Sequence, residues 1–242
     1  MCFAAHQWQV YELSRHGHSH DDIVHIDCDV TDITSCHAAI DKVLQHANHI
    51  DVVISNAGYG IAGAVEFTGE EDAHKQMEVN FFGAFHLTQA VLPTMREHKK
   101  GRILYTSSVA AVLPVPYQAF YSASKAAINA MALSLQNEVK PFGIQISVLM
   151  PGDVSTGFTD ARTKGMQGAE IYTHAQSAVE SMEKDEREGM KPEKMAALFY
   201  KMATVHSPRP FYVGGMIYKL FYYLSQILPS RFVNWIEGKM YS

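Results

Sequence analysis

The 242-residue chain is poor in several features that would assign it to a particular class of protein. Its three cysteines, Cys2, Cys28 and Cys36, are odd in number and lack metal-ligand spacing, which predicts reduced thiols in a cytoplasmic protein. The first residues carry neither a basic start nor a sustained apolar run, so no secretory signal peptide is expected. The longest apolar stretch, 211–228, contains two glycines and Lys219, which favours an amphipathic or buried segment over a membrane span.

Strong charge is also lacking. The formal net charge of −5 is modest and unclustered, which argues against a nucleic-acid partner held by phosphate contacts. His16, His18 and His20 lie in a polar turn without a closing ligand, so no metal site is predicted. A hydrophobic content of 47% predicts a packed core, and no internal repeat or linker divides the chain. We therefore expect one well-buried domain, 1–242.

The stretch 101–125 organises the rest of the chain. A short apolar, β-branched run ends in hydroxyls at Ser108, and an alanine-rich helical segment opens with Tyr121. A strand that ends at Ser108 and a helix that begins at Tyr121 would place both hydroxyls at one end of a sheet. Lys125 lies four residues after Tyr121, so the two share one helix face.

This grouping predicts proton chemistry. A phenol with a pKa near 10 is a poor acid or base at neutral pH unless a neighbouring cation favours its phenolate. Lys125 is the expected cation, and Ser108 could offer its hydroxyl to a carbonyl or alcohol oxygen. Tyr121 could then exchange a proton with that oxygen while a cofactor supplies the hydride.

Apolar runs and helical spacing alternate along the chain. Strands are expected at 9–13, 23–26, 50–54, 103–105, 144–149 and 211–214, and helices at 33–49, 70–98, 121–139, 192–206, 216–228 and 232–236. Pro93 should end or kink the long helix. This alternation predicts a parallel, doubly wound α/β sheet with ligands beyond the carboxyl ends of its strands. The segment 153–190 has no strong period and is expected to be a mobile lid over the pocket.

Further motifs follow in a fixed order. Asn56-Ala57-Gly58 follows a strand, Asn80 lies in a Val-Asn-Phe-Phe-Gly sequence, Ser108 precedes Tyr121 by thirteen residues, and Pro151-Gly152 follows another strand. On these residues the sequence resembles the short-chain dehydrogenase/reductase family over nearly its whole length. The resemblance implies a single Rossmann-like NAD(P)-binding oxidoreductase domain, with a substrate lid at 153–190 and an aromatic C-terminal segment at 207–242. A homo-oligomer is also expected.

The resemblance implies catalytic roles for four residues. Tyr121 would be the general acid in reduction and the base in oxidation, and Lys125 would lower its pKa and hold the cofactor ribose. Ser108 would bond the substrate oxygen; Ser107 is the alternative, but adjacent strand residues face opposite sides. Asn80 would anchor a water that links Lys125 to solvent, or else be an interior amide bonded to backbone.

The cofactor-binding residues come from four strand ends. Asp29 and its neighbour would meet the adenine, the Asn-Ala-Gly turn would border the adenosine side, and the Pro-Gly turn would receive the nicotinamide carboxamide. Arg15 follows a strand where no carboxylate is present, which favours NADP over NAD; a solvated turn charge is the alternative. The full set is Ser14, Arg15, Asp29, Val30, Asn56, Ala57, Gly58, Tyr121, Lys125, Pro151, Gly152, Val154 and Thr156.

One departure from the family is expected to matter. The family opens with a strand and a Thr-Gly-x-x-x-Gly-x-Gly turn that holds the pyrophosphate, and this sequence contains neither. The stretch 58–63 fits a dinucleotide fingerprint, but no helix follows directly, so a loop is expected there. Residues 1–6 resemble the end of the helix that should follow the missing turn. The chain is thus expected to begin inside its first βα unit, with the strands at 9–13 and 50–54 facing a gap.

The sequence as a whole predicts an NADP-dependent oxidoreductase that interconverts a ketone or aldehyde and an alcohol. An apolar, lipid- or steroid-like substrate is expected because the lid and the C-terminal segment are rich in aromatic and aliphatic residues. Two alternatives stay open. The chain could be a truncated, non-catalytic remnant that cannot bind the cofactor, or the apolar stretch 211–228 could make a peripheral membrane contact.

Overall fold

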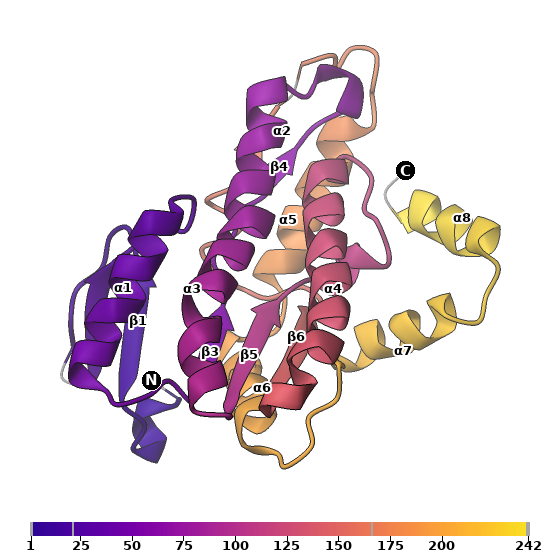
Figure 1. Cartoon of the computed structure of the whole chain (residues 1–242). Helices are drawn as coiled ribbons and strands as arrows, with labels where there is room; N and C mark the ends of the chain where they lie inside the picture. Colours follow the sequence, from indigo (N-terminus) through magenta and orange to yellow (C-terminus); the bar gives the residue numbers. More distant parts are fainter. Residues whose placement is uncertain (1, 21, 166, 241–242) are drawn as a thin grey trace.

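A computed structural model describes residues 2–20, 22–165 and 167–240. The strands are β1 (Val10–Ser14), β2 (Ile23–Asp27), β3 (Val52–Ser55), β4 (Ile61–Ala62), β5 (Gly101–Thr106), β6 (Ile144–Pro151), β7 (Thr163–Lys164) and β8 (Phe211–Gly214). The helices are α1 (Ile33–His46), α2 (Glu70–Met77), α3 (Gly83–Glu97), α4 (Ala119–Val139), α5 (Ala175–Arg187), α6 (Pro192–Thr204), α7 (Met216–Ser225) and α8 (Ser230–Met240). Strands and helices alternate as expected, and the chain forms a single α/β domain (Figure 1).

The main sheet has the strand order β3-β5-β6-β8, and every pair in it is parallel. Alternate residues of β5 enter different cores, because successive side chains of a strand face opposite sides. Ile103 and Tyr105 pack with helices α3 and α4, whereas Leu104 packs with Phe199 and Met202 of α6. All three β5 side chains are fully buried, so the sheet is covered on both faces.

A second, smaller parallel sheet contains β1 and β2. In Figure 1 it lies with α1 at the left of the molecule, beside α3 and the edge strand β3. Within the described residues β1 pairs only with β2, and β3 pairs only with β5. The expected gap between these two strands is therefore present, and the parallel sheet is divided there.

The expected long helix at 70–98 is three pieces. Helix α2 ends at Met77, a π-helical turn covers Glu78–Phe82, and α3 continues from Gly83. Pro93 lies inside α3 and does not end it, because the helix runs on to Glu97. Asn80 lies in the π-helical segment, and its side chain is fully buried.

The aperiodic segment 153–190 contains a helix that the sequence pattern did not reveal. Helix α5 buries Ala175, Ala178, Val179 and Met182, which follow helical spacing. Two of these are alanines, and the remaining positions are mostly polar, so the apolar stripe is weak. Of the helices described, none is long and apolar enough to cross a membrane.

Candidate active site

The carboxyl end of β5 and the first turn of α4 bring the predicted hydroxyls together. Ser108 follows β5 by two residues and caps a short 3₁₀ turn, its Oγ accepting a hydrogen bond of 3.1 Å from the Ala110 N–H. Tyr121 is the third residue of α4 and its phenol is hydrogen-bonded to Ser108. The expected pairing of these two side chains is therefore present in the structure.

Lys125 lies one helical turn after Tyr121 and points into the same region. Its Nζ is 5.8 Å from the centroid of the Tyr121 ring and donates a hydrogen bond of 2.9 Å to the Thr106 carbonyl oxygen. The residue is buried, with 3% of its surface exposed. Burial lowers the pKa of the ammonium to about 8, because the charged form loses solvation.

The pKa of Tyr121 moves opposite to the expected direction. Burial raises it to about 12, and this effect outweighs the hydrogen bond from Ser108, which acts to lower it. The expectation that Lys125 would bring this pKa below its ordinary value is therefore not met. Among the charged groups that act on the phenol, Glu186 and Asp153 raise its pKa and Arg162 lowers it.

Asn80 is held entirely by protein groups. Its Oδ1 accepts from the Tyr59 N–H at 3.0 Å, and its Nδ2 donates to the Tyr59 carbonyl and to Ser124 Oγ, both at 3.0 Å. These bonds favour the alternative of an interior amide bonded to backbone. The same amide is close to the site, since a Cβ added at Gly58 would lie 3.2 Å from Asn80 Oδ1 and 3.3 Å from Lys125 Nζ.

Ser107, the alternative to Ser108, is turned into the protein. Its Oγ donates a hydrogen bond of 3.1 Å to the Lys125 carbonyl oxygen, and 2% of its surface is exposed. Adjacent residues thus have separate tasks: Ser107 fixes α4 against β5, and Ser108 meets Tyr121.

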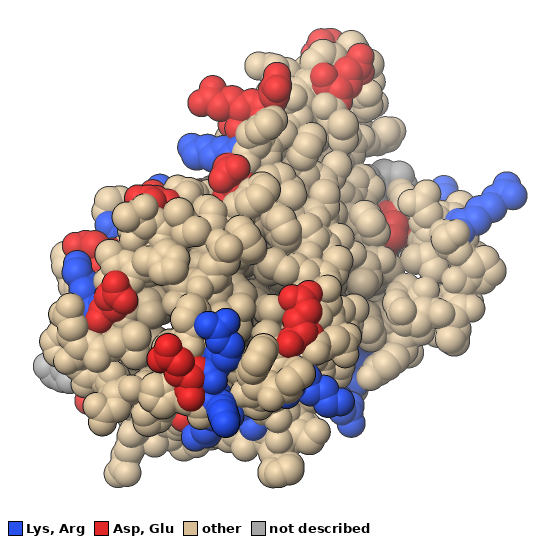
Figure 2. All heavy atoms as spheres, in the orientation of Figure 1, with Lys and Arg blue, Asp and Glu red and all other residues tan. Residues whose placement is uncertain are grey.

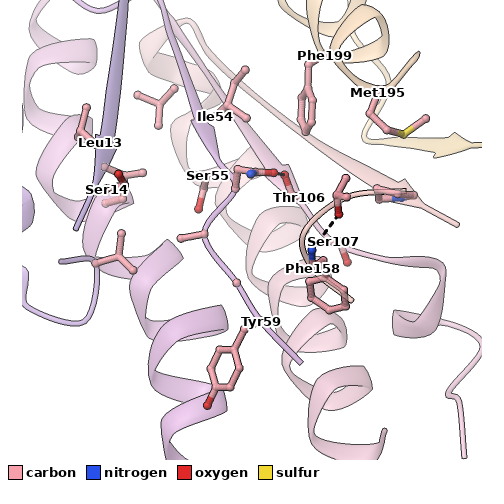
Figure 3. A pocket seen from close by; sticks show the side chains of 18 of the residues that line it. Leu13, Ser14, Ile54, Ser55, Tyr59, Thr106, Ser107, Phe158, Met195 and Phe199 are labelled. Carbon is pink, nitrogen blue, oxygen red and sulfur yellow. Dashed lines mark hydrogen bonds between the residues drawn. The ribbon is translucent and has the colours of Figure 1, made fainter. Parts of the chain in front are cut away.

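One cavity of about 2640 Å³ connects the predicted residues. It is larger than an ordinary ligand pocket of about 300 to 1,000 Å³ because it includes the space between β1 and β3. Figure 3 shows Leu13 and Ser14 on one side of this space and Ile54 and Ser55 on the other. Of the predicted site, its wall contains Ser14, Arg15, Asp29, Val30, Asn56, Ala57, Gly58, Ser108, Tyr121, Lys125, Pro151, Gly152, Val154 and Thr156.

The donor set of this wall fits a nicotinamide dinucleotide at its two ends. Gly58 leaves room beside Lys125 that a Cβ would fill, so a ligand can approach the backbone closely there. At the far end Arg15 is exposed and acts on the Asp29 carboxyl, lowering its pKa together with stronger hydrogen bonds from Thr31. Asp29 therefore also has the role of a turn acceptor.

Residues of the lid that no motif indicated complete the site. The Phe158 ring lies 5.5 Å from the Tyr121 ring, and the Arg162 guanidinium lies 5.5 Å from the Phe158 ring. The Arg162 side chain is fully buried and forms an ion pair with Glu186 of α5, while Thr159 Oγ1 donates to Glu186 at 2.8 Å. Within the segment 153–190, the loop that carries Phe158 is thus fastened to α5 beside the proposed proton donor.

Helix α7 closes another part of the wall. Tyr218 packs against Gly152, where any Cβ would collide with its ring, and the Tyr218 hydroxyl donates a hydrogen bond to Asp153. The turn expected to receive the nicotinamide is therefore shaped by a residue more than sixty positions later. Sequence spacing carries no signal for this contact.

Comparison with known proteins identifies the class to which this site belongs. Residues 6–167 match the family model for short chain dehydrogenases, and the chain belongs to that family. It is 38% identical over 212 residues to a 3-ketodihydrosphingosine reductase of Bacteroides thetaiotaomicron, an alignment that covers 86% of this chain and 78% of the relative.

Solved structures agree with this assignment. A short-chain dehydrogenase from Streptomyces avermitilis superposes with a TM-score of 0.83 at 25% identity, covering 99% of this chain and 90% of that one. A gluconate 5-dehydrogenase from Burkholderia cenocepacia, solved in complex with NADP and tartrate, gives a TM-score of 0.56 at 30% identity, covering 58% of this chain and 55% of that one.

Proposed function

We propose that the protein is an NADP-dependent oxidoreductase that reduces an apolar ketone or aldehyde to the alcohol. The observation that carries this proposal is the hydrogen-bonded pair of Ser108 and Tyr121, with Lys125 one turn away, at the wall of a large cavity. Carbonyl reduction requires a protein to bring together a polarising hydroxyl, a proton donor and a buried cation.

Each residue has a separate task. Ser108 donates a hydrogen bond to the carbonyl oxygen and orients it toward Tyr121. Tyr121 transfers its phenolic proton to that oxygen. Burial raises its pKa to about 12, so the phenol is protonated at neutral pH and needs a neighbouring cation to become a stronger acid. When bound, a nicotinamide cofactor supplies the hydride. Lys125 would hold the cofactor ribose beside these groups.

Arg15 supports the choice of NADP. It is exposed at the end of β1, on the wall of the cavity, and the neighbouring Ser14 is a hydroxyl instead of a carboxylate. A guanidinium accepts a 2′-phosphate in two parallel hydrogen bonds, whereas an acidic residue at such a position would select ribose hydroxyls.

The walls near Tyr121 support an apolar substrate. Phe158, Met182, Tyr218 and Phe221 line the cavity, and they come from the lid, α5 and α7. The Bacteroides relative is named for reduction of a long-chain ketone, 3-ketodihydrosphingosine. This compound is therefore the first substrate to test.

The test measures NADPH and NADH oxidation by absorbance with 3-ketodihydrosphingosine, and separately with a short water-soluble ketone. We expect turnover of the long-chain ketone with NADPH, a lower kcat/KM with NADH, and a lower kcat/KM for the short ketone. Tyr121→Phe is the matched control, since it removes only the hydroxyl. Turnover in that variant equal to wild type would overturn the assignment of Tyr121.

A non-catalytic binding protein is the second candidate, and the divided sheet favours it. Within the described residues β1 and β3 share no hydrogen bonds, so the adenosine end of the cavity is not tied to the catalytic end by a continuous sheet. Titration of NADPH fluorescence separates the two candidates. Saturable binding is expected for the oxidoreductase, and no binding of either cofactor would favour the second candidate.

A further inference from the structure

Helix α7 presents an apolar face that nothing in the described structure covers. Met216, Leu220 and Tyr223 follow helical spacing and lie on one side of the helix, and Ile227 follows one turn later. Their exposed fractions are 90%, 56%, 52% and 77%, respectively. A helix at the surface of a globular protein ordinarily places polar residues there.

The opposite face of α7 is already used. Tyr218, Phe221 and Tyr222 pack against the main hydrophobic core, and Tyr218 and Phe221 also line the active-site cavity. Helix α7 is therefore apolar on both sides and separates the cavity from the exterior. Figure 1 shows α7 and α8 at the right of the molecule, extending away from the sheet.

Helix α8 continues this exposed surface. Phe232 and Trp235 are 46% and 59% exposed, and their rings stack with centroids 5.8 Å apart. Val233, on another side of the helix, packs against the core. We call Met216, Ile217, Leu220, Tyr223, Ile227, Phe232 and Trp235 the C-terminal apolar surface; all seven are exposed.

The exposed charges of the segment 207–242 have one sign. Arg209, Lys219, Arg231 and Lys239 are exposed, and the only acidic residue of the segment 207–242 is Glu237, which is buried. Burial also raises the Glu237 pKa. In Figure 2 the lobe at the right is mostly uncharged, with blue side chains at its rim and a red group where it meets the rest of the molecule. The rest of the chain is acidic, since the net charge is −5.

We propose that α7 and α8 dock on an anionic lipid bilayer. Aromatic and aliphatic side chains beside Lys and Arg suit the boundary between head groups and acyl chains, where rings enter and cations meet lipid phosphates. A second copy docked through the same surface would place these basic side chains against one another. An anionic bilayer matches both kinds of side chain, because its acyl chains accept the apolar residues and its phosphates accept the basic ones.

Docking would place the membrane next to the cavity wall formed by Tyr218 and Phe221. A long-chain ketone dissolved in the bilayer would then reach Tyr121 without crossing water. This second step rests on the proposed function; the docking itself does not.

The experiment is co-sedimentation of the full chain with vesicles of phosphatidylcholine alone and of phosphatidylcholine with phosphatidylserine. Wild type should sediment with the anionic vesicles. Leu220→Ser should bind them roughly tenfold more weakly, and Lys219→Glu at least about fivefold more weakly. The matched controls are Leu133→Ser and Lys140→Glu, which change an exposed leucine and an exposed lysine elsewhere. Thermal melts check that all four variants fold.

Three results would overturn the proposal. Wild type could fail to sediment with either vesicle, or Leu220→Ser and Leu133→Ser could lose vesicle binding equally. The third is a dimer in analytical ultracentrifugation that Leu220→Ser abolishes, with no binding to vesicles. A separate assay compares the long-chain ketone in vesicles with a short soluble ketone. Leu220→Ser should raise KM for the first only. Sedimentation without any ketone turnover would leave docking standing and reject the proposed function.

Discussion

The two sides of the active-site cavity are built differently. On one side Ser108, Tyr121 and Lys125 extend from β5 and α4, and β5 is hydrogen-bonded to a strand on each side. On the other side β1 pairs with β2 alone within the described chain, and all five β1 residues are partly exposed. Arg15 and Asp29 belong to this second side.

If the proposed function holds, proton transfer and cofactor binding depend on separate parts of the fold. The proposed catalytic side chains are buried or partly buried and have partners before any ligand binds, which is the arrangement that preorganised sites require. The far side is held to the rest mainly where α1 packs against α3. Changes on the first side should therefore alter rate, and changes on the second should alter cofactor affinity.

The largest effect is expected from Tyr121→Phe. Removing the phenolic proton should lower kcat by roughly 10² to 10⁴, with little change in the dissociation constant for NADPH. Stopped-flow or steady-state kinetics with fluorescence titration measure both. A variant with normal kcat and weak NADPH binding would reverse the assignment of roles to the two sides.

Lys125→Met should affect both sides, because Lys125 lies at the border of the catalytic and cofactor regions. Its pKa of about 8 means that the ammonium loses its proton as the pH rises through that value. Wild-type kcat/KM for reduction should therefore fall above about pH 8, and NADPH binding should weaken over the same range. In Lys125→Met, kcat/KM and NADPH affinity should both be low and should not change further as the pH rises through about 8. If the fall above about pH 8 persists in the variant, another group causes it.

Arg162→Met tests how firmly the lid is held over Tyr121. The change leaves Glu186, whose side chain is 13% exposed, without its cation, whereas Glu183 keeps its ion pair with Lys164. Breaking a buried pair costs about 3 to 5 kcal/mol of unfolding free energy. Arg187→Met, which removes an exposed pair with Asp160, is the matched control and should cost less than about 1 kcal/mol. Equal urea midpoints for the two variants would show that the buried pair does not hold the lid.

The smallest effect is expected from Arg15→Glu on the far side. A carboxylate there should repel the 2′-phosphate and accept ribose hydroxyls, shifting the ratio of kcat/KM for NADPH over NADH by about tenfold. The shift should appear in the cofactor KM, with kcat unchanged. Lys140→Glu controls for net charge, and the same ratio in both variants would show that Arg15 does not read the ribose phosphate.

Local spacing determined much of this protein. The apolar runs predicted β1 to β3, β5, β6 and β8 to within about three residues, since a strand buried on both faces needs consecutive aliphatic side chains. The four-residue interval of Tyr121 and Lys125 placed both on one helix face, and Ser108 at the strand end meets the Tyr121 hydroxyl. These relations are short-range, or follow from the rule that parallel strands end at one edge of a sheet.

Only the tertiary structure decided the rest. Helix α5 was missed because alanines make half of its buried face, and burial of small residues depends on what packs against them. The direction of the Tyr121 pKa was wrong because desolvation is set by neighbours from the whole fold. Phe158, Arg162 and Glu186 meet across a loop and a helix, and Tyr218 reaches Gly152 from α7. Such contacts join distant segments, so no periodicity within one segment can encode them.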